Sequence, residues 1–268
     1  MNILQNNKPM IMGILNLTPD SFSDGGKFNN IDAAINQGKR MIDEGADIID
    51  IGGESTRPGA SEVSLEEELL RTIPIIESLS QKIKQTISID TSKPEVMKAA
   101  IEAGASLVND VNALQNPGAL ENVCDTQVDV CLMHMQGKPR TMQQNPKYKN
   151  VIDDIKDFFD QRIFACKEYG IDESRIILDP GFGFGKTFEH NLEILNRFGE
   201  FKSFGLRLLS GLSRKSMIGA MLNNAEVSDR VIGSVTAAII TVQNGADIIR
   251  VHDVSETQDA LDILSYTS

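Results

Sequence analysis

The sequence has few cysteines and no surplus of positive charge, and each absence excludes a class of protein. Its three cysteines, Cys124, Cys131 and Cys166, form no CxxC pair and have no metal-type spacing to a histidine, which favours free thiols in a reducing compartment. Acidic residues outnumber basic ones by 38 to 26, which gives a formal net charge of −12. An acidic chain without a basic tract is a poor partner for nucleic acid or for an anionic membrane surface.

Long apolar runs are also missing. No stretch approaches the roughly 20 apolar residues that a transmembrane helix needs, and residues 1–8 lack the basic and apolar regions of a secretory signal. We therefore expect a soluble, cytoplasmic protein. Its 268 residues, 41% hydrophobic and 24% charged, are typical of a globular chain, and with no linker-like stretch we expect one domain over residues 1–268.

Short apolar runs alternate with longer amphipathic stretches along the whole chain. The predicted strands are residues 10–15, 48–51, 86–89, 107–108, 128–133, 175–178, 206–209 and 247–251. Helical patterns between them include residues 31–44, 65–79, 94–103, 151–169 and 192–198. Strands separated by helices indicate a parallel sheet. Eight strands in this length favour a single (β/α)8 TIM barrel of the α/β class, with an open doubly wound sheet as the alternative.

Polar residues stand at the ends of nearly all the predicted strands. In a barrel these ends point to one mouth, where active sites of this architecture lie. We therefore expect a ring of polar side chains there, formed by Asn16, Asp50, Asp90, Asn109, His134, Asp179, Ser210 and Arg250.

A glycine-rich loop, residues 181–186, directly follows Asp179 and Pro180. Its GxGxG spacing fits neither a dinucleotide fingerprint nor a Walker loop. Glycines at a strand end let a planar ligand approach the backbone, and Phe182 or Phe184 is placed to cover its ring. The Asp179 carboxylate suits two parallel hydrogen bonds from a guanidine-like edge, such as that of a pterin or guanine.

Two turn-rich loops, residues 16–26 and 52–59, follow the first two strands. Surface linkers have a similar composition. Because both loops leave the same face and carry the opposite charges Asp24 and Arg57, we also consider them as lids that close over a substrate.

Cations gather after the last two strands, in residues 213–216 and 250–252. This is the usual anion-binding corner of such barrels, and we count Arg214 among its cations. Of the histidines, His252 is expected to point the same way as Arg250. His134 suits either core support or the site wall, and His190 is expected to be exposed and incidental.

In this order, the motifs resemble the dihydropteroate synthase family of folate biosynthesis. The match covers essentially the whole chain and departs from it at Asn112 and Ala113, where many members carry a nearby glycine. The residues that carry the resemblance are 12–16, 19–26, 52–59, 88–91, 109–110, 132–134, 179–186, 213–215 and 250–252.

The resemblance implies a reaction. Enzymes of this family join 6-hydroxymethyl-7,8-dihydropterin diphosphate to p-aminobenzoate, forming 7,8-dihydropteroate and releasing diphosphate. They are TIM-barrel homodimers that use Mg²⁺ and are sulfonamide targets. Because an arylamine is already neutral at pH 7, the difficult step is breaking the C–O bond, and we expect an SN1-like displacement without a covalent enzyme intermediate.

The resemblance also assigns residues to roles. The pterin site comprises Asp90, Asn109, Met133, Asp179, Phe184 and Lys215. The diphosphate site comprises Asn16, Arg57, Arg250 and His252, with Asn16 also a metal ligand for Mg²⁺. The p-aminobenzoate site comprises Phe22, Thr56, Pro58, Lys215 and Ser216. The catalytic groups are Asp24, Arg57, Lys215, Arg250 and His252.

Two other functions fit parts of this pattern. A pterin-dependent methyltransferase of the same barrel type shares the Asp and Asn pterin contacts, although it has no need for the combined cationic motifs. A non-catalytic folate-binding protein has no need for the diphosphate and Mg²⁺ positions.

Overall fold

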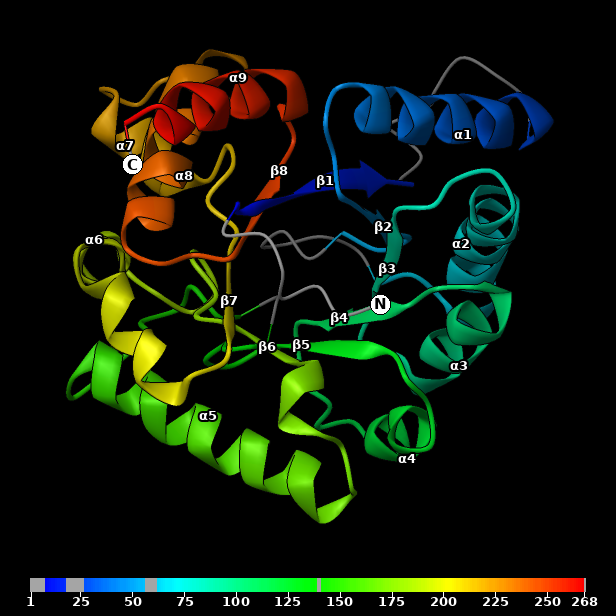
Figure 1. The fold of residues 1–268 in the computed structure, drawn as a ribbon. Coiled ribbons are helices and arrows are strands. Elements are labelled where there is room, and N and C mark those ends of the chain that lie inside the picture. Colours follow the sequence, from blue (N-terminus) through cyan, green and yellow to red (C-terminus); the bar gives the residue numbers. More distant parts are fainter. Residues whose placement is uncertain (1–7, 18–26, 56–61, 139–140, 268) are drawn as a thin grey trace.

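The computed structural model describes residues 8–17, 27–55, 62–138 and 141–267. Eight parallel strands close into a barrel in chain order, with β1 paired to both β2 and β8 (Figure 1). The predicted TIM barrel is confirmed, and the open doubly wound sheet is excluded. The strands are β1 (Met10–Asn16), β2 (Ile48–Gly52), β3 (Thr86–Asp90), β4 (Leu107–Asp110), β5 (Asp129–Met133), β6 (Ile176–Asp179), β7 (Arg207–Ser210) and β8 (Ile248–Val251).

Helices surround the barrel. They are α1 (Lys27–Asp43), α2 (Leu65–Ser80), α3 (Pro94–Ala103), α4 (Ala119–Cys124), α5 (Val151–Glu168), α6 (Phe188–Arg197), α7 (Ser216–Met221), α8 (Val231–Gln243) and α9 (Val254–Ser265). Short 3-10 segments cover Glu173–Arg175, Phe198–Phe204 and Val227–Arg230. Within the described ranges, none of the helices has the length and apolarity to span a bilayer.

Helix α6 begins four residues before the predicted position, and a histidine explains the difference. The Thr187 hydroxyl accepts a hydrogen bond from the backbone N–H of His190 (3.2 Å), and His190 Nδ1 accepts one from the N–H of Thr187 (3.2 Å). This reciprocal pair is a capping box with histidine in the usual place of glutamate. The expectation that His190 is incidental is therefore wrong, because the residue starts the helix that follows the glycine-rich loop.

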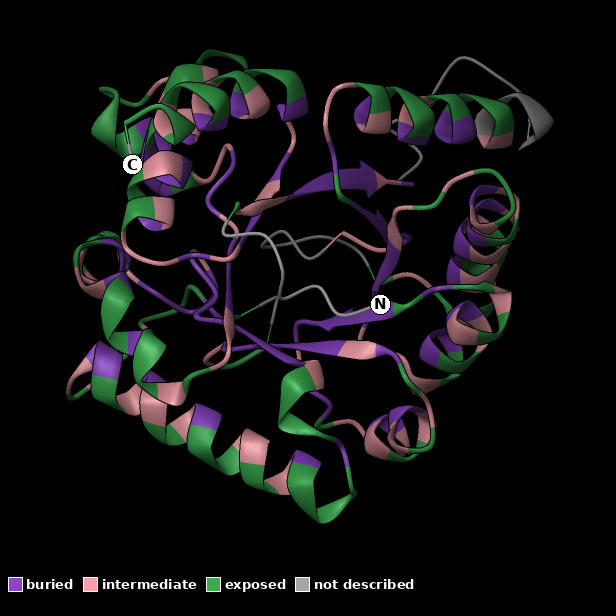
Figure 2. Ribbon diagram, in the orientation of Figure 1, coloured by how far each residue is buried: buried purple, intermediate pink, exposed green. Residues whose placement is uncertain are grey.

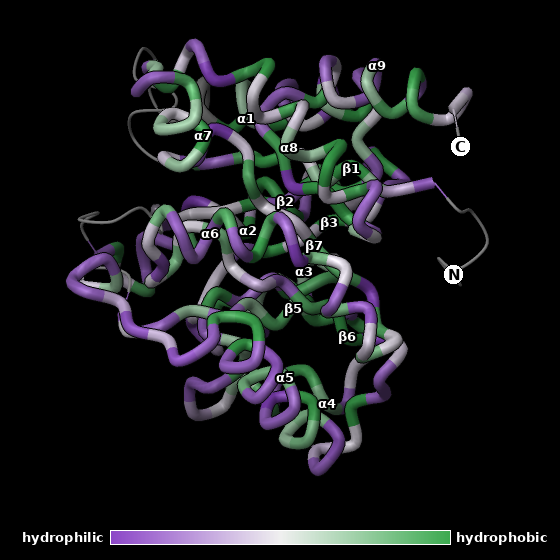
Figure 3. The backbone as a smooth tube through the Cα atoms, turned by 90° about the vertical axis from the view of Figure 1, so that its left-hand side faces the viewer, coloured by the Kyte–Doolittle hydropathy of each residue, from purple (hydrophilic) through white to green (hydrophobic). Residues whose placement is uncertain are grey.

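The barrel interior is filled in layers, as is usual for eight-stranded barrels. Its lowest layer is wholly apolar and at most 3% exposed. A second apolar layer lies between the sheet and the helices, and burial and hydropathy both follow the strands and the inner helix faces (Figures 2 and 3). The interior layer consists of Met12, Ile48, Leu107, Cys131, Ile177, Leu209 and Ile248.

A polar layer lies above this apolar floor, toward the mouth. Side chains two residues apart on a strand point to the same face, so the second residue after each floor residue also faces the interior. The floor closes the barrel from below, and a ligand must therefore enter from the carboxyl ends of the strands. The residues in these positions include Asp50, Asn109, Met133, Asp179 and Arg250.

The outer layer yields a stability prediction. Phe159 on α5 is fully buried, with ring centroids of Phe201 at 6.0 Å and Phe204 at 5.8 Å. Phe159→Ala is expected to lower the free energy of unfolding by about 3–5 kcal/mol, because it leaves a cavity in the core. The control Phe164→Ala, on the same helix but 65% exposed, is expected to change it by at most about 0.5 kcal/mol. Urea unfolding measures both, and equal losses would contradict the packing described.

Candidate active site

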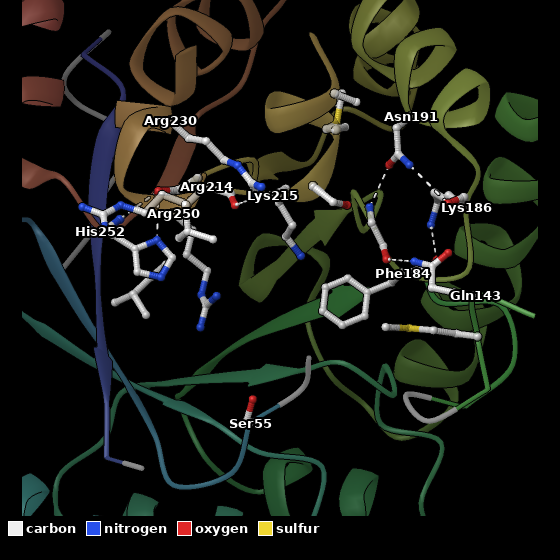
Figure 4. Close-up of a pocket in the computed structure, with 18 of the residues that line it drawn as sticks. Ser55, Gln143, Phe184, Lys186, Asn191, Arg214, Lys215, Arg230, Arg250 and His252 are labelled. Atoms are coloured by element: carbon white, nitrogen blue, oxygen red, sulfur yellow. Dashed lines mark hydrogen bonds between the residues drawn. The ribbon is translucent and has the colours of Figure 1, made fainter. Parts of the chain in front are cut away.

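A cavity of about 680 Å³ opens at the carboxyl ends of the strands (Figure 4). Its walls come from the strand ends and from the loops after β2, β5, β6 and β7. Residues far apart in the sequence therefore meet at the expected mouth. The sequence-predicted site residues on its lining are Asn16, Asp90, Phe184, Lys215, Ser216, Arg250 and His252.

Arg250 is held between two buried carboxylates. Its Nε donates to Asp50 Oδ2 (2.6 Å) and its Nη2 donates to Asp90 Oδ2 (2.6 Å). Asp50 also accepts hydrogen bonds from Ser88 Oγ (2.6 Å) and from Asn109 Nδ2 (3.2 Å). One guanidinium thus offsets two carboxylates in a water-poor layer, where unpaired charges are costly.

Asp90 keeps one acceptor atom unused. Among the described residues, its Oδ1 is one of two buried side-chain atoms without a hydrogen-bond partner, the other being Ser210 Oγ. Burial raises the pKa of Asp90 to about 7; Arg250 opposes the rise and Asp50 adds to it. Because Asp90 also lines the cavity, its free oxygen is available to a donor on a bound ligand.

Asn109, Met133 and Asp179 are buried and do not line the cavity directly. They lie beside it, because Asn109 pairs with the lining residue Asp90 and Met133 packs with the lining residues Phe184 and Met142. Asp179 pairs with Met133 in the register of β5 and β6. Asp179 Oδ1 accepts the N–H of Gly181 (2.8 Å). Burial raises the pKa of Asp179, and the Gly181 hydrogen bond and the Lys215 charge oppose the rise.

Phe184 and Lys215 approach each other across the cavity wall. The Lys215 Nζ lies 4.0 Å from the centroid of the Phe184 ring, within the range of a cation–π contact. The ring comes from the loop after β6 and the amine from the start of α7, so this contact joins two separate loops (Figure 4).

His252 and Arg214 differ in what they offer an anion. His252 Nδ1 lies 2.9 Å from Ser213 Oγ, and its ring faces the same cavity as Arg250. The Arg214 guanidinium instead donates through Nε (3.1 Å) and Nη2 to the Asp253 carboxylate. Arg214 also lines the cavity and shares its charge with Asp253, so the expectation that it supplies an anion-binding cation stays a prediction.

Arg214 also stabilises the turn of the loop that follows β7. Its φ of 56° is the left-handed conformation, which is costly for a residue with a long side chain. Its N–H donates to Ser234 Oγ (2.9 Å), and its carbonyl accepts from Arg230 Nη1 (3.1 Å). These contacts and the Asp253 pair hold the turn that presents Lys215.

The sequence analysis left Asp50, Lys186 and the loop-base residue Glu54 without a role. Asp50 lies two residues after Ile48 and therefore points, like Ile48, to the inside of the barrel. This two-residue period is the sequence signal that indicates an inward-facing carboxylate. Glu54 lines the cavity and pairs with Lys93, which also donates to Glu68 Oε2 (2.5 Å). No sequence period indicates this ion-pair cluster, because its members come from three separate segments.

Five sequence-predicted residues, all in the two turn-rich loops, lie outside the described residues, and their roles stay predictions. These residues are Phe22, Asp24, Thr56, Arg57 and Pro58.

Known proteins resemble this chain over nearly its whole length. Residues 12–252 match the family model described as "Pterin binding enzyme". The dihydropteroate synthase of Escherichia coli is 52% identical over 259 residues, which cover 97% of this chain and 92% of that protein.

Solved structures agree with the sequence matches. A sulfonamide complex of Yersinia pestis dihydropteroate synthase superposes with a TM-score of 0.92 at 52% identity, over 97% of this chain and 94% of that one. The Xanthomonas albilineans enzyme in complex with 7,8-dihydropteroate superposes with a TM-score of 0.89 at 45% identity, with the same two coverages of 97% and 94%. The chain belongs to the dihydropteroate synthase family of pterin-binding enzymes.

Proposed function

We propose that the chain catalyses the reaction for which this family is named, joining 6-hydroxymethyl-7,8-dihydropterin diphosphate to p-aminobenzoate and releasing diphosphate. The observation that carries the proposal is one cavity whose lining includes both a buried carboxylate with an unused oxygen, that of Asp90, and the cationic side chains Lys215 and Arg250. A pterin diphosphate carries a group for each, a donor-rich ring edge and an anion.

The carboxylate side suits the pterin. The guanidine-like edge of a pterin presents parallel N–H donors, and carboxylates such as Asp90 and Asp179 accept them in charge-assisted pairs. The unpartnered Oδ1 of Asp90 is one such acceptor. Phe184 offers a flat face for the ring, Asn109 and Met133 lie beside these groups, and Lys215 is placed to donate to the pterin carbonyl.

The cationic side suits the leaving group. Arg250 and His252 line the cavity on the end of β8 and in the turn after it, and Asn16 lines it at the end of the neighbouring strand β1. Positive groups fixed in a water-poor site stabilise the negative charge that develops on diphosphate as the C–O bond breaks. The ring of the dihydropterin delocalises the positive charge left on the methylene carbon, which supports an SN1-like step.

The second substrate needs little activation. The arylamine nitrogen of p-aminobenzoate is neutral at pH 7 and carries its own lone pair, so no strong general base has to deprotonate it before attack. We place p-aminobenzoate beside Lys215 and Ser216, on the wall formed by the start of α7. We also assign to this site Phe22, Thr56 and Pro58, together with Asp24 and Arg57 from the two loops considered as lids.

We propose that Mg²⁺ binds together with the diphosphate. Among the described residues there is no group of three or more His, Cys, Asp or Glu side chains that suits a metal ion. The amide oxygen of Asn16 lies on the cavity lining. Mg²⁺ commonly takes one or two protein ligands and fills its shell with substrate phosphates and water, so Asn16 fits it. Bound there, the ion offsets charge on the leaving group.

The proposal also includes the oligomeric state, a homodimer of two copies of the chain. Apolar side chains of α6, α7 and α8 remain exposed, with Ile232 82% exposed, and such a patch marks an interaction surface. We propose that a homodimer covers it; residence in the cytoplasm stays a prediction. This patch, which we call the α6–α8 patch, consists of Leu192, Met221, Leu222 and Ile232.

Diphosphate release tests the reaction. With purified protein, we expect release to require the dihydropterin diphosphate, p-aminobenzoate and Mg²⁺ together, and to stop when the metal is chelated. Asp179→Asn is expected to raise the pterin KM by about 10- to 100-fold, because an acceptor becomes a donor that faces donors. The exposed control Asp259→Asn is expected to change nothing.

Other results of the diphosphate-release assay would contradict the proposed reaction. Release without p-aminobenzoate would indicate simple hydrolysis. No release under any condition would favour a methyltransferase or a binding protein, and a normal KM for Asp179→Asn would remove that residue from the pterin site.

Asp90 makes pterin binding depend on pH. Its pKa of about 7 means that the unliganded side chain carries a proton at lower pH, which the ligand's donors must displace. Affinity is therefore expected to rise with pH through 7 and to be about tenfold weaker at pH 6 than at pH 8. Calorimetric titration measures it. Asp90→Asn is expected to bind weakly with a flat profile, and a flat profile in the unsubstituted protein would contradict the assignment.

The dimer has its own test. Ile232→Glu puts a charge in the α6–α8 patch, and we expect sedimentation to show a monomer at concentrations where the unsubstituted protein is a dimer. Phe164→Glu, at an exposed apolar position on α5, serves as the control and is expected to leave the dimer intact. A monomeric unsubstituted protein, or equal disruption by both variants, would contradict the proposed interface.

A further inference from the structure

Lys186, the last residue of the glycine-rich loop, is buried with 2% exposure. Its Nζ lies within hydrogen-bond distance of four acceptors, which share its N–H donors: the carbonyl oxygens of Gly181 (2.9 Å), Phe184 (3.0 Å) and His134 (3.2 Å), and His134 Nδ1 (2.9 Å). Among the described side chains, no carboxylate forms an ion pair with it. The amine is therefore held almost entirely by backbone carbonyls.

A lysine in this setting is costly, because burial disfavours its charged form. Burial accordingly lowers the pKa of Lys186 well below its ordinary value. Burial and the neighbouring lysine also lower the pKa of His134 well below its usual range, so the imidazole is neutral and Nδ1 accepts a hydrogen bond. An ion pair therefore does not explain why this lysine is buried. The carbonyl oxygens around it do, because each of them needs a hydrogen-bond donor away from water.

The loop is pressed closely against the segment that follows β5. Gly181 and Gly185 have φ of 69° and 63°, a conformation that favours glycine. A Cβ on Gly181 would lie 2.0 Å from the carbonyl oxygen of His134, and one on Gly185 would lie 2.3 Å from that of Gln136. The two segments therefore meet backbone to backbone, and Lys186 donates hydrogen bonds to both of them.

The same loop carries part of the cavity wall. The Phe184 carbonyl accepts from Lys186, and the Phe184 ring faces the Lys215 amine. From the other side, Asn191 Oδ1 accepts the N–H of Gly183 (2.7 Å), and the Gln143 amide donates to the Gly183 carbonyl (Figure 4). Loss of the lysine contacts would release the Phe184 backbone from the end of β5 while these outer contacts remain.

We propose that Lys186 is a positioning residue for the pterin: its amine fixes the 181–185 loop to the end of β5, so that the Phe184 ring keeps its place in the cavity wall, in contact with Lys215. The inference rests on the proposed function of the cavity. Lys186 does so through the backbone of Phe184 and takes no part in bond breaking.

Steady-state kinetics of Lys186→Met test this role, because methionine fills similar space without donors. We expect the KM for the dihydropterin diphosphate to rise by about tenfold or more, as several buried carbonyls lose their donor. The KM for p-aminobenzoate is expected to change less than about threefold, since of the residues assigned to that site only Lys215 contacts the loop that Lys186 holds. Lys167→Met, an exposed lysine on α5, is the matched control and should leave both values unchanged.

A double substitution separates positioning from general destabilisation. If Lys186 acts through Phe184, adding Lys186→Met to Phe184→Ala should raise the pterin KM by less than about twofold further. Additive effects, an unchanged pterin KM in folded Lys186→Met, or equal rises for both substrates would overturn the proposal. Should Lys186→Met fail to fold, Lys186→Gln is measured instead; because it retains two amide donors, a smaller rise is expected, still in the pterin KM alone, and equal rises for both substrates would overturn the proposal.

A spectroscopic readout keeps this inference distinct from the proposed function. The chain has three histidines, so their ring signals can be followed separately by NMR. Lys186→Met is expected to raise the pKa of His134, because a neighbouring positive charge is lost. An unchanged His134 titration would contradict the local geometry. Failure of the unsubstituted protein to turn over both substrates would refute the proposed function, whatever the His134 result.

Discussion

The ion pairs of Arg250 with Asp50 and Asp90 are the interaction on which the rest of the site depends. Buried carboxylates that lack a cationic partner are costly, because burial removes them from water. Arg250 lies between them and lets a buried layer retain acceptors for a pterin. Because the same guanidinium lines the cavity, one side chain connects the acceptor side of the mouth with the cationic side.

Barrel periodicity explains how much of this was predictable. The eight strands and their polar ends follow from short apolar runs, so β1 to β8 and the identity of the mouth emerge from the sequence alone. Asp50 and Asp179 lie two residues after an interior apolar side chain, and that period shows that they face inward. The helices match where the pattern is amphipathic, as in α3, whose bounds agree at both ends.

Features that depend on contacts between distant loops were not predictable. The start of α6 is set by a histidine cap that lies outside the usual Ser/Thr-x-x-Glu pattern. A run of basic residues does not show that Arg214 is already paired with Asp253, nor that it adopts a left-handed turn. The spacing of the glycine-rich loop matches no nucleotide-binding motif and gives Lys186 no role, and only three-dimensional packing shows that its amine lies among backbone carbonyls. The acidic net charge likewise conceals a mouth whose described lining includes the cationic side chains Arg214, Lys215, Arg230 and Arg250.

Our central claim is that one barrel mouth holds both ends of a pterin diphosphate, with its ring on the carboxylate side and its anion on the cationic side. A crystal structure of the protein with 6-hydroxymethyl-7,8-dihydropterin diphosphate and Mg²⁺ tests this most directly. We predict that the ring lies against Phe184 and donates to Asp90 and Asp179, while the diphosphate meets Asn16, Arg250 and His252. A ring bound outside this layer, or a diphosphate that contacts neither Arg250 nor His252, would contradict the account.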